Sequence, residues 1–271
     1  MIVDAHLHCS GKETQRDVLR TLDDAGVDRA CLLAPFLSDD YKLDDAASLR
    51  EANAHLGRVV CGAEDRLIGF AVVNPSIEGA YDDLHQAVET HHLRGLKLVP
   101  TGWYPYDECA HRVYDAAAEL GLPVLFHSGI FIDGRSGRYC RPAFFEAVRD
   151  HSGLRVTLAH LGWPWTDEAI AVGLIDRING VPSDACQFRF DLSFGAPPPY
   201  RLEGLDRAIQ VLGAELLQFG SDSFLPCDGA SIRAARDEVA VLLDRLEVCA
   251  TDQARIFGGT AAAWIDGGKA T

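Results

Sequence analysis

Short apolar runs alternate along the chain with longer segments in which apolar residues recur at helical spacing. This alternation predicts repeated strand and helix units around a parallel sheet. The expected strands cover residues 2–7, 29–34, 67–73, 95–99, 123–126, 155–159, 188–192 and 216–219. Eight such strands predict a (β/α)8 TIM barrel, although an open doubly wound sheet would show much the same local pattern.

Helices are expected between these strands, and two of them end at a glycine. The expected helices cover residues 14–25, 44–56, 80–91, 110–120, 142–149, 166–178 and 205–212. Gly26 and Gly121 follow helical runs directly, where a left-handed terminal residue is needed. Since single barrels run to about 250 residues and no linker or repeat interrupts the sequence, we expect one domain over residues 1–271.

Composition and charge narrow the class of partner. Hydrophobic residues make up 48% of the chain and charged residues 24%, the usual balance of a globular protein with a sizeable core. The formal charge of -15 disfavours binding to nucleic acid or to an anionic membrane surface. The first residues do not resemble a signal peptide, and the eight cysteines form no CxxC pair. We therefore expect a cytoplasmic protein with a small-molecule substrate; the sequence leaves its oligomeric state open, a homo-oligomer included.

Two histidines mark the end of the first expected strand. In the segment DAHLH, His6 and His8 are two residues apart, so their side chains project from the same face. Neutral imidazole is a common ligand of zinc and similar ions, and a catalytic site needs about three protein ligands and one open position. An isolated HxH pair is a weak signal, because two structural histidines would look the same.

Further polar residues end other strands. His127 follows PVLF, His160 follows RVTLA, and Asp222 follows LLQFGS. Because all strand ends of one polarity meet at one face of a parallel barrel, these side chains should converge with His6 and His8. The alternative is that each is a hydrogen-bonded core histidine or a helix-capping aspartate. The coincidence of all of them at strand ends favours a functional site.

The sequence resembles the amidohydrolase superfamily, in the branch that contains metal-dependent hydrolases and decarboxylases similar to aminocarboxymuconate semialdehyde decarboxylase. The resemblance is carried by the segments DAHLH at 4–8, RGLKLVP at 94–100, LPVLFHSG at 122–129, LAHLGW at 158–163, FGSD at 219–222 and IFGGTAAAWI at 256–265. These segments span nearly the whole chain. Each is common by itself, but their combination is specific.

The resemblance implies that His6, His8, His127 and Asp222 bind one divalent metal ion. We expect zinc, with manganese as the alternative. His160 would then be an acid/base or charge-stabilising group, or a ligand if a second ion binds. A metal lowers the pKa of a water ligand to about 7, and Asp222 would accept the proton.

Lys97 is the ambiguous position. Two-metal members of the superfamily use a carbamylated lysine on the fourth strand to bridge the ions, but the GLKL setting here resembles the one-metal branch more. Relatives often have KLHP where this chain has KLVP, which removes one polar group from the expected substrate site. We expect Lys97 to face the substrate or to be structural.

Loops at the same barrel end carry candidate substrate contacts. Trp103 and Trp163 would supply aromatic walls for a flat organic ligand, and Arg135 or Arg138 could bind a carboxylate through paired hydrogen bonds. Most loop arginines are solvated, so we expect at most one of them to be functional.

These observations predict a metal-dependent hydrolase of a small amide, lactone or related cyclic carbonyl compound. Asp222 would move the proton, and His160 would stabilise the developing charge. The nearest alternative is a nonoxidative decarboxylase of an unsaturated or aromatic carboxylic acid at the same site. A barrel that binds a ligand without turnover is disfavoured, because such a relative would be expected to lack at least one metal ligand.

Overall fold

Parallel strands form the centre of the molecule, in a computed structural model that describes residues 1–37, 40–193 and 195–267. The strands follow one another in chain order from β1 to β8, and β9 lies on the other side of β1. They are β1 Val3–His8, β2 Arg29–Leu33, β3 Leu67–Val72, β4 Gly95–Leu98, β5 Pro123–Phe126, β6 Arg155–Leu158, β7 Phe188–Asp191, β8 Leu217–Gln218 and β9 Ser223–Phe224. Each of the eight predicted strands is confirmed to within one residue.

The eighth strand consists of two short pieces, β8 and β9, and closes the barrel. The Ala5 amide donates to the Phe219 carbonyl (3.0 Å), and the Asp222 amide donates to the His6 carbonyl (2.8 Å). The segment between the two pieces therefore runs alongside β1. The sequence predicted only the first piece, because the left-handed backbone of Asp222 (φ 54°) interrupts the strand. The closed ring confirms the barrel over the open sheet.

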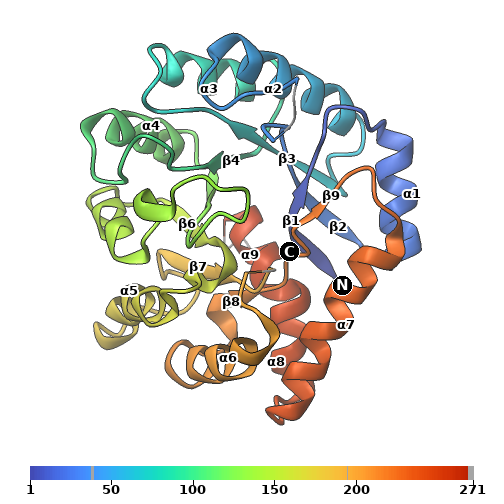
Figure 1. Cartoon of the computed structure of the whole chain (residues 1–271), viewed down its shortest axis with the longest axis vertical. Helices are drawn as coiled ribbons and strands as arrows, with labels where there is room; N and C mark the ends of the chain where they lie inside the picture. The colour runs from blue at the N-terminus through green and yellow to red at the C-terminus, as the bar shows by residue number, and fades with distance from the viewer. Residues whose placement is uncertain (38–39, 194, 268–271) are drawn as a thin grey trace.

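The helices surround the strands on the outside, except α9, which lies near the centre of the view (Figure 1). They are α1 Gln15–Ala25, α2 Ala46–Val60, α3 Ala80–Glu89, α4 Glu108–Glu119, α5 Thr166–Ile178, α6 Pro198–Leu212, α7 Gly229–Arg245, α8 Ala250–Ala254 and α9 Thr260–Asp266. Short 3₁₀ segments are η1 Gly137–Tyr139, η2 Pro142–Asp150, η3 Ala159–Gly162 and η4 Ala214–Leu216, and η5 Arg255–Gly259 is a π-helical turn. The helix predicted over residues 142–149 is thus a run of 3₁₀ turns. None of the described helices is long and apolar enough to cross a membrane.

The predicted glycine stops are confirmed. Gly26 ends α1 with a φ of 69°, and its amide donates to the carbonyls of Leu22 and Asp23. Gly121 follows α4 with a φ of 65°. A side chain at either position would make this left-handed conformation costly, and glycine adopts it without strain.

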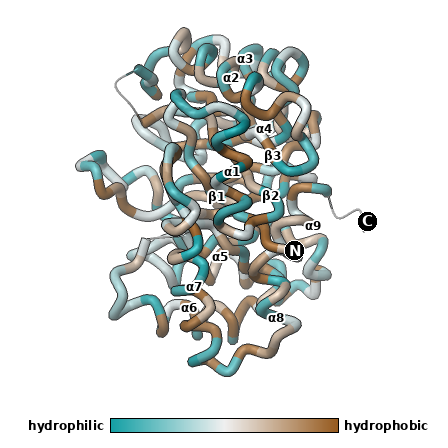
Figure 2. Tube along the Cα trace, turned by 90° about the vertical axis from the view of Figure 1, so that its right-hand side faces the viewer, coloured by the Kyte–Doolittle hydropathy of each residue, from teal (hydrophilic) through white to brown (hydrophobic). Residues whose placement is uncertain are grey.

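Helix α9 closes the barrel at the end where the strands begin. Its residues Ala261, Trp264 and Ile265 are buried together with the inward-facing residues of β1, β2 and β3. The Trp264 Nε1 atom donates to the Arg155 carbonyl (3.0 Å) at the start of β6. Figure 2 shows that hydrophobic and hydrophilic residues alternate along the surrounding helices. Polar side chains lie at the opposite end of the barrel, where the strands end.

Candidate metal centre and active site

The carboxyl ends of the strands supply a ring of ionisable side chains. They come from β1 (His6 and His8), β4 (Lys97), the residues after β5 and β6 (His127 and His160), the end of β7 (Asp191) and the turn between β8 and β9 (Asp222). This is the face of a barrel on which catalytic groups gather, because each strand presents its last residues there.

Three donor atoms converge at the centre of this ring. The Nε2 atoms of His6 and His8 lie 3.1 Å apart. The Asp222 Oδ1 atom lies 3.4 Å from the first and 3.0 Å from the second. Donors about 2.0–2.1 Å from a tetrahedral zinc ion would lie about 3.3–3.4 Å from one another, so the observed spacing is close to that of a ligand set.

His6 is held by a carboxylate behind it. Its Nδ1 atom lies 2.8 Å from Asp191 Oδ2. Burial, and then the charge of Lys97, lower the pKa of His6 to about 4, so the ring is neutral near pH 7. The proton is donated from Nδ1 to Asp191, and Nε2 keeps its lone pair. Carboxylates of this kind orient metal-ligating histidines in many proteins.

Asp222 presents its two oxygens differently. Oδ1 contacts the imidazoles, whereas no described residue bonds to Oδ2. Burial alone would raise the pKa of Asp222, but the nearby His6 and His160 and the hydrogen bond from His8 hold it far below the usual range. The side chain is therefore an ionised carboxylate with one oxygen free.

His127 stands apart from the three converging donors. Its ring stacks on Phe131 with a centroid distance of 4.1 Å, and it lies edge-on to His160 at 5.1 Å. Its Nε2 atom is buried and has no hydrogen-bond partner among the described residues. Burial, and then the neighbouring His160, lower its pKa well below the usual value, so the ring is neutral. A neutral, buried and unpartnered imidazole nitrogen fits a metal ligand.

His160 sits in a left-handed turn, with a φ of 60°. It packs so closely on Gly195 that a Cβ there would approach the His160 Cβ to 2.6 Å. Its amide donates to Asp191 Oδ1 (2.8 Å), and its Nδ1 lies 2.9 Å from Ser193 Oγ. With His6 and Asp191 it forms a second group of donor atoms within 4.8 Å, but these residues are already bonded to one another.

Lys97 is buried at the floor of the site, only 1% exposed. Its Nζ atom lies 3.3 Å from His6 Nε2. Burial lowers the pKa of Lys97 to about 8, although Asp191 and Asp222 favour its charged form. The amine is thus close to the candidate metal position.

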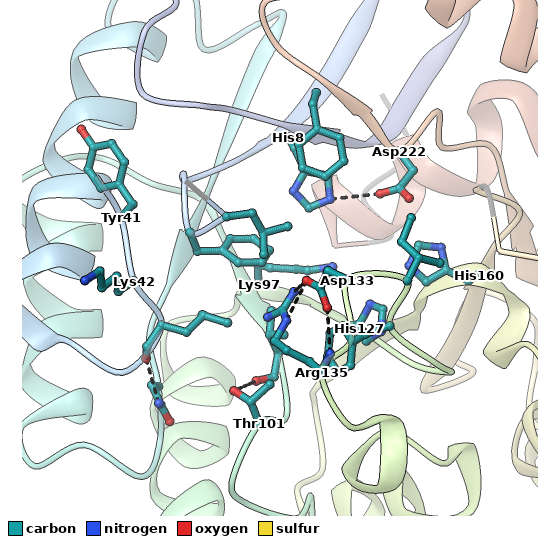
Figure 3. Close-up of a pocket in the computed structure, with 18 of the residues that line it drawn as sticks. His8, Tyr41, Lys42, Lys97, Thr101, His127, Asp133, Arg135, His160 and Asp222 are labelled. Carbon is teal, nitrogen blue, oxygen red and sulfur yellow. Dashed lines mark hydrogen bonds and ion pairs between the residues drawn. The ribbon is translucent and has the colours of Figure 1, made fainter. Parts of the chain in front are cut away.

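A cavity of about 1180 Å³ opens above these residues. In Figure 3, His8, Asp222, His127 and His160 lie on one side of the cavity and Tyr41 and Lys42 on the other. Its walls include the predicted substrate residues Lys97, Arg135 and Trp163. The Arg135 side chain is paired with Asp133 (2.7 Å) and lies over the Phe131 ring.

Two predicted substrate residues are not brought to the cavity. Trp103 is 1% exposed and packs in the core outside the strands. Arg138 lies over the ring of its neighbour Tyr139, at 4.6 Å from the centroid, and does not line the cavity. Both lie in loops at the correct end of the barrel, but their side chains turn away from the site.

Several site residues were missed by the sequence reasoning. Asp191 and Ser193 lie behind the imidazoles, and Lys12, Tyr41 and Lys42 reach the cavity from loops. The available signal was a charged residue, Asp191, at the end of the apolar strand 188–192. Surface loops gave no comparable signal.

The chain belongs to the amidohydrolase family, because the family model described as Amidohydrolase matches residues 3–266. No protein with a curated description matches the sequence.

Solved structures share the fold. An uncharacterised TIM-barrel protein from Bordetella bronchiseptica has a TM-score of 0.71 at 15% identity, covering 99% of each chain. The probable 2-pyrone-4,6-dicarboxylic acid hydrolase of Acinetobacter baumannii, with citric acid bound, has a TM-score of 0.64 at 14% identity and covers 98% of this chain and 99% of its own. The 5-carboxyvanillate decarboxylase of Novosphingobium aromaticivorans, complexed with manganese and a nitrobenzoic acid, has a TM-score of 0.65 at 17% identity, covering 92% and 79%.

Proposed function

We propose that this protein is a metal-dependent hydrolase of a small cyclic carbonyl compound, a lactone or amide, that carries a carboxylate. The observation that carries the proposal is the convergence of His6 Nε2, His8 Nε2 and Asp222 Oδ1 within 3.0–3.4 Å at the floor of the cavity. His127, with its unpartnered Nε2, would complete the ligand set. We propose zinc as the ion; the manganese complex of the decarboxylase neighbour supports manganese as the alternative.

A bound divalent ion would polarise the substrate carbonyl and make water acidic enough to ionise near pH 7. The protein supplies the other parts. Asp222 Oδ2 is free to accept the proton of the attacking water, while Oδ1 stays with the ligand group. His160 exchanges a proton with the reacting group from the cavity wall.

The cavity is suited to an anionic substrate. Lys12, Lys42 and Lys97 line it, and none of them forms an ion pair with a described carboxylate. Arg135 adds a fourth cation, which is paired with Asp133, and Trp163 provides a flat apolar wall. Asp40, Asp44, Asp133 and Asp222 line the same cavity, so the preference for a carboxylate rests on the three lysines that form no ion pair with a described carboxylate. The names of two neighbours, a pyrone dicarboxylic acid hydrolase and a carboxyvanillate decarboxylase, point to the same class of compound.

Decarboxylation at the same centre is the second candidate, and the likeness to the carboxyvanillate decarboxylase favours it. Lys97 and Arg135 would then hold the carboxylate while a proton replaces carbon dioxide.

A panel of carboxylated lactones, cyclic amides and aromatic acids tests both reactions. Hydrolysis adds one water to the product mass, whereas decarboxylation releases carbon dioxide. Release of carbon dioxide without hydrolysis would exclude the first proposal in favour of the second. If metal-loaded protein forms neither product, both proposals are contradicted.

His160→Ala separates the acid/base role from a ligand role. We expect the variant to keep its metal and to lose about 10²–10⁴-fold in turnover, the usual cost of a missing acid or base. Elemental analysis of the same sample is the second measurement. Loss of the metal would show that His160 is a ligand.

A further inference from the structure

We propose that Ser193 is a positioning residue that keeps the proton of His160 on Nδ1, so that Nε2 presents a lone pair to the cavity. What His160 then does in catalysis rests on the proposed function, but its tautomer does not. The proposal follows from the hydrogen-bond donors and acceptors around one hydroxyl group.

Ser193 Oγ has one proton and three acidic or basic neighbours, of which His6 Nδ1 is the most distant at 3.3 Å and already donates its proton to Asp191 Oδ2. It is in hydrogen-bond contact with Asp191 Oδ1 and lies 2.9 Å from His160 Nδ1. An ionised carboxylate can only accept, so the single hydroxyl proton must go to Asp191. The hydroxyl oxygen must then accept from His160, which requires a proton on Nδ1.

The surroundings of Asp191 fix this direction. Oδ1 also accepts from the amides of His160 (2.8 Å) and Ser193 (3.0 Å), and Oδ2 accepts from His6 Nδ1 (2.8 Å). Every neighbour of this carboxylate is a donor, which favours its ionised form. Ser193 is 5% exposed, so bulk water has little access to the hydroxyl.

The other ring nitrogen of His160 faces the cavity. Nε2 has no hydrogen-bond partner among the described residues, and His160 lines the cavity wall. In the Nδ1-protonated neutral form, Nε2 accepts a proton and cannot donate one. His160 can therefore take over the proton that Asp222 Oδ2 accepts from the attacking water. The O–H bond on Asp222 breaks as an N–H bond forms at His160 Nε2, and the same proton then passes to the leaving oxygen or nitrogen.

This assignment refines the expectation that His160 stabilises developing charge. A neutral ring of this tautomer offers no N–H to the cavity. It gains one only after taking the proton, when the positive ring faces the Ser193 and Asp191 pair.

Nitrogen NMR of the metal-free protein tests the tautomer directly. Protein labelled with ¹⁵N-histidine is recorded at a pH of about 8, where an ordinary imidazole is neutral. His160→Gln assigns the signals. We expect a protonated Nδ1 and an unprotonated Nε2 in the parent, and in Ser193→Ala a mixture of the two tautomers. A parent ring protonated on Nε2 would overturn the proposal, as would an unchanged tautomer in Ser193→Ala.

Ser128→Ala is the matched control. The Ser128 hydroxyl is also buried beside this turn, but it donates to the Ala159 carbonyl (2.6 Å) and not to the ring. The control should keep the Nδ1 tautomer. The same change of tautomer in both variants would show general loosening of the turn and contradict a specific role of Ser193.

Activity provides a second readout once a substrate is found. We expect Ser193→Ala to lower kcat about 10–100-fold with KM and metal content near parental values, the scale of lost partners behind a catalytic group. This loss should vanish in a His160→Ala background, whereas a merely structural defect would persist there and contradict the proposal. If the parent protein has neither proposed activity, the proposed function fails, and the NMR result still decides the tautomer.

Discussion

The two ends of the barrel share the same strands but bury opposite kinds of side chain. Where the strands begin, Trp264, Ala261 and Ile265 of α9 fill the interior with apolar contacts. Where the strands end, neutral imidazoles, ionised carboxylates and one buried lysine occupy it. His160 and Asp222 adopt left-handed backbone conformations there, and His127 Nε2 lacks a described partner.

One end of the barrel therefore contributes mainly to stability, and the other end carries the groups proposed for catalysis. Apolar packing contributes to the free energy of folding, whereas strained backbone and unpartnered polar atoms oppose it and persist where function needs them. Substitutions at the α9 end should therefore unfold the protein. Substitutions at the other end should inactivate it without unfolding it.

The largest expected effect comes from removing one converging ligand at the functional end. His6→Ala should reduce bound metal well below one ion per chain and lower kcat/KM by about three orders of magnitude or more, because a catalytic metal supplies several kcal/mol. Elemental analysis and kinetics measure both. His85→Ala, on the outer helix α3, is the control and should change neither. Full activity in His6→Ala protein verified to be metal-free would refute the metal centre.

The same substitution, tryptophan to alanine, can be made at each end of the barrel to compare the two ends. Trp264 is fully buried and its ring lies 5.3 Å from that of Phe70, so Trp264→Ala should lower the free energy of unfolding by about 3–5 kcal/mol. Trp163 lines the cavity, so Trp163→Ala should cost only about 1 kcal/mol and raise KM instead. Urea unfolding monitored by circular dichroism measures the free energy of unfolding of each variant. Equal losses of stability in both variants would contradict the difference between the two ends of the barrel.

Asp222→Asn should separate two tasks of one side chain. Asparagine can still offer an oxygen to the metal but cannot accept a proton, so the variant should fold and retain some metal while kcat falls by about two orders of magnitude or more. Single-turnover kinetics and metal analysis are the measurements. Near-parental turnover would mean that Asp222 merely caps its turn, a task that asparagine performs about as well.

A smaller, pH-dependent effect is expected at Glu13, in the loop after β1. Burial alone would raise the pKa of Glu13, but hydrogen bonds from His55, from nearby backbone amides and from Ser10 lower it to about 2. A lowered carboxyl pKa stabilises the fold above the ordinary value of 4.5, and this contribution is lost as the pH falls toward about 2.

Glu13→Gln should therefore lower the free energy of unfolding by about 2 kcal/mol at pH 7, the scale of hydrogen bonds to a charged group. The difference from the parent should shrink as the pH falls below about 4.5, which urea titrations at several pH values measure. A difference that stays constant down to pH 4 would disprove the role of the charge.

The strands were predictable because each is a short apolar run bounded by polar or glycine residues, and the convergence of His6, His8 and Asp222 followed from strand polarity. The break between β8 and β9 was not predictable. It depends on the left-handed backbone of Asp222, which tertiary hydrogen bonds to β1 impose and no local pattern encodes.

The substrate residues were harder to predict, because the direction of a loop side chain depends on packing. Trp103 packs in the core and Arg138 on Tyr139, although both occupy loops at the functional end. Asp191 was missed although it lies on a strand and not in a loop. A carboxylate at a strand end looks like an ordinary cap until the fold brings His6, from a strand 185 residues earlier, into contact with it.

The position of α9 also affects the order in which the chain can fold during synthesis. The interior of the strands made first, β1 to β3, is filled by residues 261–265, near the end of the printed sequence. At ribosomal rates of about 5–20 residues per second, those strands emerge tens of seconds before the helix that covers them. Their apolar inner faces stay open throughout this interval, so chaperones have a long opportunity to bind the nascent barrel.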